Sequence, residues 1–359
     1  MVKSLLGWFL LLLLTNIPAR AQRYVVADQD AAGPGGSGMT SLLVLLQSPD
    51  VKVLGVTVVT GDGWRDAEAA HALRLLEIIG RTDVRVYAGA LGPLVRTQEW
   101  TALADQMYGP PSYKGAWGNV LGDDSMPEGK PTTKVADEDA VHFMIRMVHQ
   151  YPHRVTIYAA GPLTNVALAV SLDSQFAELA QELVVMGGSI NPQTEAPEWS
   201  SNPRHEFNFW FDPEAASIVL KARWPKISVT TIDASLKTRL EPEVLDGLAG
   251  SKAVAAQYTL KYTHRPVAIN YLWDELAAAA WLDPSIITRE RFFYMDVNTD
   301  HGAGYGDTLT YADQSRPKIT LQKVHTQMDV DLPKMQLLLV HLLSSETPNT
   351  VKPPATQTP

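Results

Sequence analysis

The 359-residue chain contains no cysteine, and this absence alone excludes several kinds of protein. A small fold held together by disulfides needs paired cysteines, and metal sites built on thiolates need them as ligands. Basic residues are also in short supply, because 30 Lys and Arg stand against 39 Asp and Glu, a net charge of -9. A general nucleic-acid binder requires a basic surface, so the charge balance excludes that class.

The chain also lacks a run of about 18 consecutive apolar residues, the length that a membrane-spanning helix requires. A basic Lys3, a shorter apolar run over residues 5–14 and a small-x-small sequence at residues 19–21 form the pattern of a secretory signal peptide. An uncleaved N-terminal anchor is the alternative interpretation. We expect cleavage after Ala21 and a secreted or periplasmic protein that is not bound to a membrane.

The rest of the chain alternates between strand and helix patterns. With 45% hydrophobic residues it can bury a large core. Apolar, Val-rich runs bounded by turn residues predict buried strands over residues 24–27, 51–60, 84–87, 155–159, 183–186 and 227–232. Helical spacing of apolar residues predicts helices over residues 67–79, 137–150, 163–170 and 213–220. These patterns indicate an α/β fold: a single domain over residues 22–344 with a mainly parallel, Rossmann-like sheet and helices on both faces.

Two segments show neither the strand pattern nor the helix pattern of apolar residues. Residues 89–134 carry Trp and Tyr among Gly and Pro. A loop of this length inside a compact domain is usually a lid, a binding loop or disordered, and the aromatic content favours a binding loop. Residues 345–359 are rich in Thr and Pro, and we expect them to form a disordered tail.

Polar residues follow the predicted strands, where ligands bind in parallel sheets. Asp28 and Asp30 end the first strand, and Asp62 follows the second. Clustered carboxylates suit a hard cation such as Ca²⁺ or Mg²⁺, and a carboxylate beside such a cation can take a proton from bound water. Ordinary turns also contain Asp-x-Asp, in which Asp28 would only accept backbone N–H groups. The glycine-rich turn over residues 33–38 has neither the lysine of a P-loop nor the spacing of a dinucleotide-binding loop.

In order and spacing, these segments resemble the nucleoside hydrolase family, in particular its inosine/uridine-preferring members. The similarity covers almost the whole chain after residue 21. It rests on Asp28-x-Asp30, residues 54–62, residues 161–169, Met186-Gly187-Gly188, residues 206–216 and Trp273-Asp274.

The resemblance implies hydrolysis of the N-glycosidic bond of nucleosides to a free base and ribose. It also implies a Ca²⁺ ion that binds the ribose diol and the attacking water. By position, Asp30 matches the general base, which is also a calcium ligand. The backbone carbonyl of Thr164 and the carboxylate of Asp274 match further calcium ligands. The family's habit implies a homodimer or homotetramer.

Four residues match substrate contacts. Glu206 and Asn208 match residues that bind the ribose, and Asp62 stands where the family usually has Asn. Trp273 stands where several members carry a histidine that protonates the leaving base. Tryptophan cannot donate that proton, although it can stack on a base. Glu206 and Asn208 as structural residues, and Trp273 as a core residue, are the competing interpretations.

The N-terminal aspartate motif diverges from the family pattern. Three extra residues follow Asp30, and Ser37 and Gly38 occupy the positions of an Asp pair, of which one binds calcium and the other the ribose. Losing two carboxylates should weaken a divalent cation site. This divergence favours one alternative, a non-catalytic nucleoside- or sugar-binding protein of the same fold. A second alternative is a hydrolase of another glycoside, for which residues 89–134 would give room.

Overall fold

The computed structural model describes residues 22–118, 125–263 and 271–348. The predicted signal peptide, residues 1–21, lies outside these residues, and so does the predicted tail from residue 349 onward. Within the described ranges, no helix combines the length and the apolar character needed to cross a bilayer.

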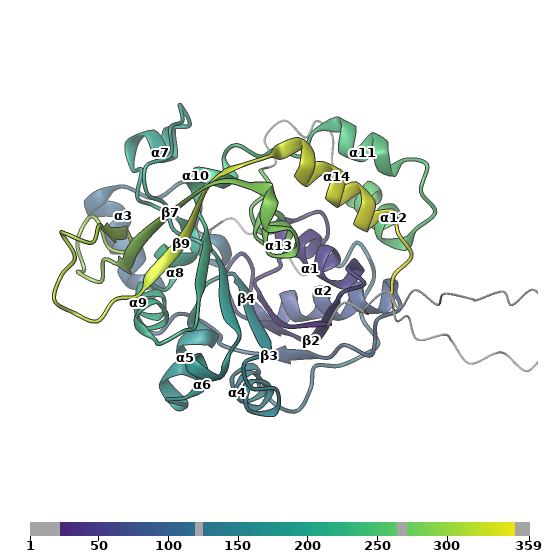
Figure 1. The fold of residues 1–359 in the computed structure, drawn as a ribbon, viewed down its shortest axis with the longest axis horizontal. Coiled ribbons are helices and arrows are strands. Elements are labelled where there is room, and N and C mark those ends of the chain that lie inside the picture. Colours follow the sequence, from purple (N-terminus) through teal and green to yellow (C-terminus); the bar gives the residue numbers. More distant parts are fainter. Residues whose placement is uncertain (1–21, 119–124, 264–270, 349–359) are drawn as a thin grey trace, which may run out of the picture.

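One mixed sheet runs through the centre of the molecule (Figure 1). Among the described residues it has nine strands in the order β3-β2-β1-β4-β5-β6-β9-β7-β8. The strands from β3 to β9 in this order are parallel, and β7 runs antiparallel to both β9 and β8. Their bounds are β1 (Arg23–Gln29), β2 (Val51–Val58), β3 (Val86–Ala88), β4 (Val155–Ala160), β5 (Glu182–Met186), β6 (Ile227–Thr230), β7 (Ile287–Val297), β8 (Thr308–Tyr311) and β9 (Lys323–Val330). The predicted α/β fold with a mainly parallel sheet is confirmed.

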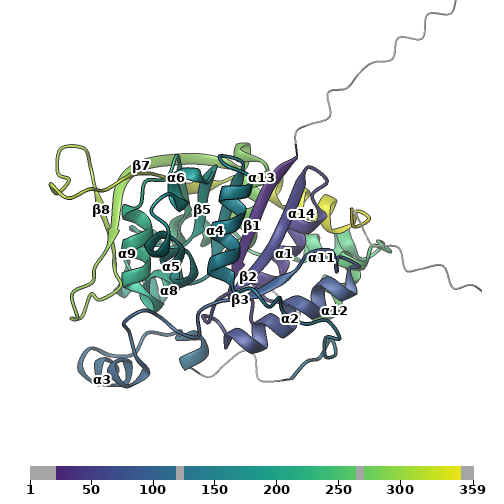
Figure 2. The same cartoon turned by 90° about the horizontal axis from the view of Figure 1, so that it is seen from below.

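Helices cover both faces of this sheet, and each face has its own apolar core (Figure 2). One face carries α1 (Ser37–Gln47), α2 (Arg65–Ile78), α11 (Pro242–Leu248), α12 (Val254–Tyr262), α13 (Asp274–Leu282) and α14 (Leu332–Leu343). The other carries α4 (Ala140–Gln150), α5 (Thr164–Leu172), α6 (Phe176–Leu179) and α9 (Pro213–Lys221). Shorter elements connect them: α7 (Pro197–Ser201), α8 (Phe207–Phe211), α10 (Ile232–Ser235), η1 (Gly115–Trp117) and η2 (Pro284–Ile286).

Two helices lack the apolar period by which helices are recognised in a sequence. Helix α1 is buried along nearly its whole length, so apolar side chains occupy all of its sides. Helix α3 (Gln98–Tyr108) has the opposite character, because Thr101 is its only buried residue. Its first turn is fixed by Thr97, whose side chain accepts the backbone N–H of Trp100 at 3.1 Å. Part of the stretch predicted as irregular, residues 89–134, is therefore helical.

The strand order places a crevice beside β1. Strand β1 pairs with β2 on one side and with β4 on the other, so the direction in which the chain adds strands reverses at this point. In open parallel sheets, ligands bind beyond the carboxyl ends of the strands at such a reversal. The polar residues that follow β1, β2 and β5 meet there.

Candidate active site

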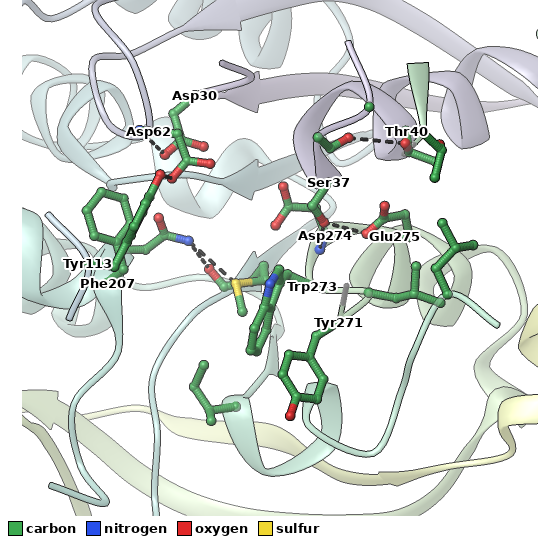
Figure 3. Close-up of a pocket in the computed structure, with 18 of the residues that line it drawn as sticks. Asp30, Ser37, Thr40, Asp62, Tyr113, Phe207, Tyr271, Trp273, Asp274 and Glu275 are labelled. Atoms are coloured by element: carbon green, nitrogen blue, oxygen red, sulfur yellow. Dashed lines mark hydrogen bonds between the residues drawn. The ribbon is translucent and has the colours of Figure 1, made fainter. Parts of the chain in front are cut away.

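A cavity of about 430 Å³ lies beyond the carboxyl ends of these strands, a size typical of small-molecule sites. Six of the seven predicted site residues line it: Asp30, Asp62, Glu206, Asn208, Trp273 and Asp274. Figure 3 shows Asp30 and Asp62 on one side of this space and Asp274 on the other. The seventh, Thr164, is buried at the start of α5, and its hydroxyl donates to Asp212 at 2.7 Å. The fold thus brings together residues that are up to 244 positions apart in the sequence.

Asp30 is held in a space that two glycines leave open. A Cβ atom on Gly61 would lie 2.2 Å from Asp30 Oδ2, and one on Gly161 would lie 3.0 Å from its Cγ. The backbone N–H of Asp62 donates to Asp30 Oδ2 at 3.0 Å. Burial, together with the negative charges of Asp62, Glu68 and Asp274, raises the pKa of Asp30 well above its usual range. A raised pKa makes a carboxylate a better proton acceptor near neutral pH.

Asp28 is buried, does not line the cavity and is tied to neighbouring elements. Its Oδ1 accepts the hydroxyl of Thr57 at 2.7 Å and the amide of Asn165 at 2.8 Å. The alternative in which Asp28 accepts only backbone N–H groups at the turn is therefore wrong, since the hydroxyl and the amide come from β2 and α5. Burial raises the pKa of Asp28 to about 7.

The long segment after β3 contributes to the site through Tyr113. The hydroxyl of Tyr113 donates to Asp62 at 2.9 Å, and its ring makes an edge-type contact with that of Phe207, with ring centroids 4.9 Å apart. Both aromatic side chains line the cavity. This contact supports the interpretation of residues 89–134 as a binding loop. Burial raises the pKa of Asp62 to about 6, although the Tyr113 hydroxyl opposes the shift.

Glu206 has a structural task as well as a place in the cavity wall. As the N-cap of α8 it accepts the backbone N–H groups of Asn208 at 2.8 Å and Phe209 at 3.0 Å, and that of Gly188 at 2.9 Å. Burial raises the pKa of Glu206 to about 7 despite these donors. Asn208 donates its amide to the carbonyl of Met186 at 3.1 Å. These bonds hold both residues in place at the end of β5.

On the opposite side, α1 meets α13 through Ser37. The Ser37 hydroxyl donates to Glu275 and accepts the backbone N–H of Asp274 at 2.9 Å. Asp274 lines the cavity and is almost fully buried at 7% exposure, and its carboxylate has no hydrogen-bond partner among the described residues. Burial and the charges of Glu275, Asp62 and Glu206 raise its pKa well above the usual range. Burial also raises the pKa of Glu275 to about 7.

The part of the cavity wall that the structure describes is acidic and holds no cationic side chain. Besides Asp30, Asp62, Glu206 and Asp274, the acidic residues Glu198 and Glu275 line it, while no Lys, Arg or His within the described ranges does so. A nearby cation would lower the pKa of these carboxyl groups, yet no cation among the described residues acts on Asp30, Asp274 or Glu206. The arrangement suits a ligand or a transition state that carries positive charge.

Gly38 leaves no room for the carboxylate that the family pattern has at this position. A Cβ atom there would lie 2.9 Å from Ala31 Cα and 2.9 Å from Gln29 Oε1. The neighbouring Ser37 is engaged by Glu275. Moreover, no three Asp, Glu or His side chains in the part of the chain that the structure describes are placed to hold one metal ion. The residues present therefore do not reproduce the calcium site that the resemblance implies.

Aromatic rings form another part of the wall. Trp273 lies 5.1 Å from Tyr271 and 5.8 Å from Trp199, measured between ring centroids, and all three line the cavity. Trp273 is half-buried and also packs against the core of the α1 face. It therefore combines the two roles that the sequence left open, a core residue and a surface on which a ring can stack.

Sequence reasoning assigned no role to Tyr113, Glu275 or Asn165. Tyr113 lies in a loop without a readable period, and only the placement of α1 against α13 gives Glu275 a partner in Ser37. Of these three residues, Asn165 had one signal in the sequence, because it belongs to the Gly161–Ala169 block on which the family resemblance rests. Its position between β1, β2 and the segment after β3 depends on the tertiary fold.

Comparison with known proteins agrees with this geometry. The family model described as "Inosine-uridine preferring nucleoside hydrolase" matches residues 25–336. "Probable uridine nucleosidase 2" of Arabidopsis thaliana is 32% identical over 276 residues, covering 74% of this chain and 80% of that protein. The inosine-uridine preferring nucleoside hydrolase of Leishmania major is 27% identical over 318 residues, covering 86% and 94%.

Solved structures show the same fold. A plant nucleoside hydrolase superposes with a TM-score of 0.72 at 25% identity, covering 90% of this chain and 99% of that one. An inosine-guanosine nucleoside hydrolase superposes with a TM-score of 0.74 at 20% identity, with the same coverage. With its sheet topology, its cavity at the end of β1 and the match over residues 25–336, the chain belongs to the inosine-uridine preferring nucleoside hydrolase family.

Proposed function

We propose that this protein hydrolyses the N-glycosidic bond of nucleosides and releases a free base and ribose. The observation that carries the proposal is the meeting of Asp30, Asp62, Asn208 and Asp274 in one acidic cavity at the strand-order reversal. The membership of the family supports the reaction type.

The proposed chemistry uses side chains that the cavity already holds. Cleavage of a C–N glycosidic bond passes through a positively charged, oxocarbenium-like sugar, which nearby carboxylates stabilise. Asp30 takes a proton from the water that attacks C1′, and its raised pKa suits that step. Asp62, Glu206 and Asn208 are the proposed contacts of the ribose hydroxyl groups.

The experiment that tests this proposal is an assay on a panel of neutral nucleosides, including uridine and inosine. We expect equimolar release of base and reducing sugar. Saturable nucleoside binding without any release would instead establish the non-catalytic binding protein. Release of sugar from other glycosides, but from no nucleoside, would establish the hydrolase of another glycoside.

Calcium is the part of the family chemistry that the described residues fit poorly. When bound in an intact site, such an ion would hold the ribose diol and acidify a water molecule. Here Asp30 and Asp274 are the two carboxylates left to hold it, with the backbone carbonyl of Thr164 as the third ligand that the resemblance implies. A site with so few charged ligands binds calcium weakly.

We therefore expect nucleoside hydrolysis to survive removal of divalent cations. Dialysis against a chelator should change kcat/KM by less than about twofold, and calorimetry should detect no calcium binding tighter than about 1 mM. Both measurements use the full chain after removal of any signal peptide. Loss of activity in chelator that calcium restores would contradict the expectation.

The location and the assembly of the protein are further parts of the proposal. The signal-peptide pattern over residues 1–21 supports export to the periplasm or the medium. A homodimer or homotetramer is proposed from the family resemblance. Light scattering on the purified chain measures the number of subunits in the assembly directly.

A further inference from the structure

Two helices that are far apart in the sequence meet at the cavity through one hydroxyl group. Ser37 is the first residue of α1, and its hydroxyl donates to the Glu275 carboxylate in the first turn of α13. The same hydroxyl oxygen accepts the backbone N–H of Asp274 at 2.9 Å. All three residues line the cavity, and Figure 3 shows them across it from Asp30 and Asp62. The hydroxyl hydrogen therefore points at Glu275, and the contact between the two helices has one defined geometry.

Ser37 completes the N-terminus of α13. The first backbone N–H groups of a helix have no partner within the helix, and a side chain just before the helix often accepts one of them. In the described part of the chain, Trp273 occupies that place and makes no side-chain cap to α13. The Ser37 hydroxyl takes this role from another helix, because it accepts the N–H of Asp274. Ser37 therefore fixes the direction in which the first turn of α13 presents its two carboxylates.

Glu275 is a buried carboxylate in the cavity wall. It is 4% exposed and follows Asp274, which is also buried. Two neighbouring carboxylates repel each other and lose hydration on burial, so other contacts must offset that cost. The N-terminus of α13 stabilises both charges through the helix dipole, and the Ser37 hydroxyl stabilises Glu275 by a charge-assisted hydrogen bond. A hydroxyl group of a ligand that donates to Glu275 would add a further contact of the same kind.

We infer that Glu275 contacts a sugar hydroxyl group of the substrate and that Ser37 is its positioning residue. The carboxylate in this part of the wall comes from α13, whereas α1, which carries Ser37 where the family pattern has Asp, supplies the hydroxyl that orients it. This inference rests on the proposed nucleoside hydrolysis. It adds a contact to the sugar of the same substrate, on the other side of the cavity from Asp62.

Glu275→Gln tests the contact by kinetics. The substitution keeps the length of the side chain and an oxygen that can accept the Ser37 hydroxyl, but it removes the charge. Because a hydrogen bond to a charged acceptor is the stronger kind, we expect KM for the best nucleoside of the panel to rise about tenfold. We expect kcat to change by less than about threefold, since the sugar hydroxyl is bound in both the ground state and the transition state. An unchanged KM, or a fall in kcat of about tenfold or more, would overturn the inference.

Substitutions of Ser37 test the positioning role. Ser37→Ala removes the hydroxyl that orients Glu275 and should raise KM by a similar factor, whereas Ser37→Thr keeps a hydroxyl and should restore the original KM. If the two residues act as a unit, the double variant Ser37→Ala with Glu275→Gln raises KM no further than the larger of the two single changes. Effects that multiply would show that the residues act independently and that Ser37 is not the positioning residue.

Ser217→Ala is the matched control for a loss of stability. Ser217 in α9 donates its hydroxyl to the Asp296 carboxylate at 2.7 Å, and both residues are buried. Neither of them lines the cavity. We expect the melting temperature to fall to a similar extent in Ser37→Ala and Ser217→Ala, but KM to rise in Ser37→Ala alone. An equal rise of KM in both variants would reveal a general loosening of the fold and would contradict the positioning role.

Binding of the sugar separates a failure of this inference from a failure of the proposed function. The probe is D-ribose, and calorimetry measures its affinity for the unmodified protein and for Glu275→Gln. We expect the substitution to weaken ribose binding about tenfold. Nucleoside hydrolysis combined with equal ribose affinity of the two proteins, or with no ribose binding by either, would overturn the inference and leave the proposed function standing. Ribose binding that depends on Glu275 in a protein that hydrolyses no nucleoside would support the sugar contact and overturn the proposed function.

Discussion

Replacing Asp30 by asparagine is expected to lower kcat for nucleoside hydrolysis by about a thousandfold, the usual size of a general-base contribution. Asparagine keeps an oxygen for the N–H of Asp62 and fits the space beside Gly61 and Gly161, but it cannot accept a proton from water. Steady-state kinetics with the best nucleoside of the panel measures the loss. Circular dichroism and the melting temperature should show that the variant is folded.

Asp28→Asn is the matched control for this prediction. Asp28 lies two residues away, on the same strand end, but outside the cavity lining. Its pKa is raised by burial to about 7, so the neutral amide is a close substitute for a group that is already partly protonated. We expect Asp28→Asn to keep nearly all of the activity. If both variants lose the same activity, the effect of Asp30→Asn comes from packing and Asp30 is not the base.

Replacing Asn165 by alanine is expected to destabilise the fold by about 3 kcal/mol, since it removes three hydrogen bonds of a fully buried side chain and leaves the backbone N–H of Ala90 without its partner. The Asn165 amide donates to Asp28 at 2.8 Å and to the carbonyl of Val58 at 3.2 Å. Its Oδ1 accepts the backbone N–H of Ala90 at 2.8 Å. One fully buried side chain therefore joins the ends of β1 and β2 to the segment that follows β3.

Urea unfolding followed by tryptophan fluorescence measures this change in the free energy of unfolding. Ser171→Ala serves as the control on the same helix, because Ser171 is exposed and its hydroxyl only donates to Ala167 within α5. That substitution should change stability by less than about 0.5 kcal/mol. An equally small effect of Asn165→Ala would show that water replaces the amide. The three hydrogen bonds of Asn165 would then not stabilise the fold.

The strand ends explain why most of the site could be predicted. In a parallel sheet, residues that follow buried strands converge at one edge, whatever their separation in the sequence. Asp30 and Asp62 follow β1 and β2, so the strand pattern alone brings them together. Trp273 and Asp274 begin α13, far along the chain, and only the family resemblance connected them with Asp30.

The limits of prediction have physical causes as well. The sequence pattern missed α1 because it is buried on all sides, and α3 because it is exposed on nearly all of them. It also missed β7, whose first residues are largely exposed and charged and so lack an apolar run.

By itself, the sequence determined the α/β class, the six parallel strands β1 to β6 and the carboxylates that follow some of them, because apolar periodicity and turn residues act over a few neighbouring positions. The tertiary structure decided what those carboxylates face. It placed Ser37 against Glu275, closed the space beside Gly38 against a side chain, and left the Asp274 carboxylate in the cavity without a hydrogen-bond partner among the described residues. These properties depend on the packing of α1 against α13, two helices more than 200 residues apart, and burial and charge are set by such neighbours in space.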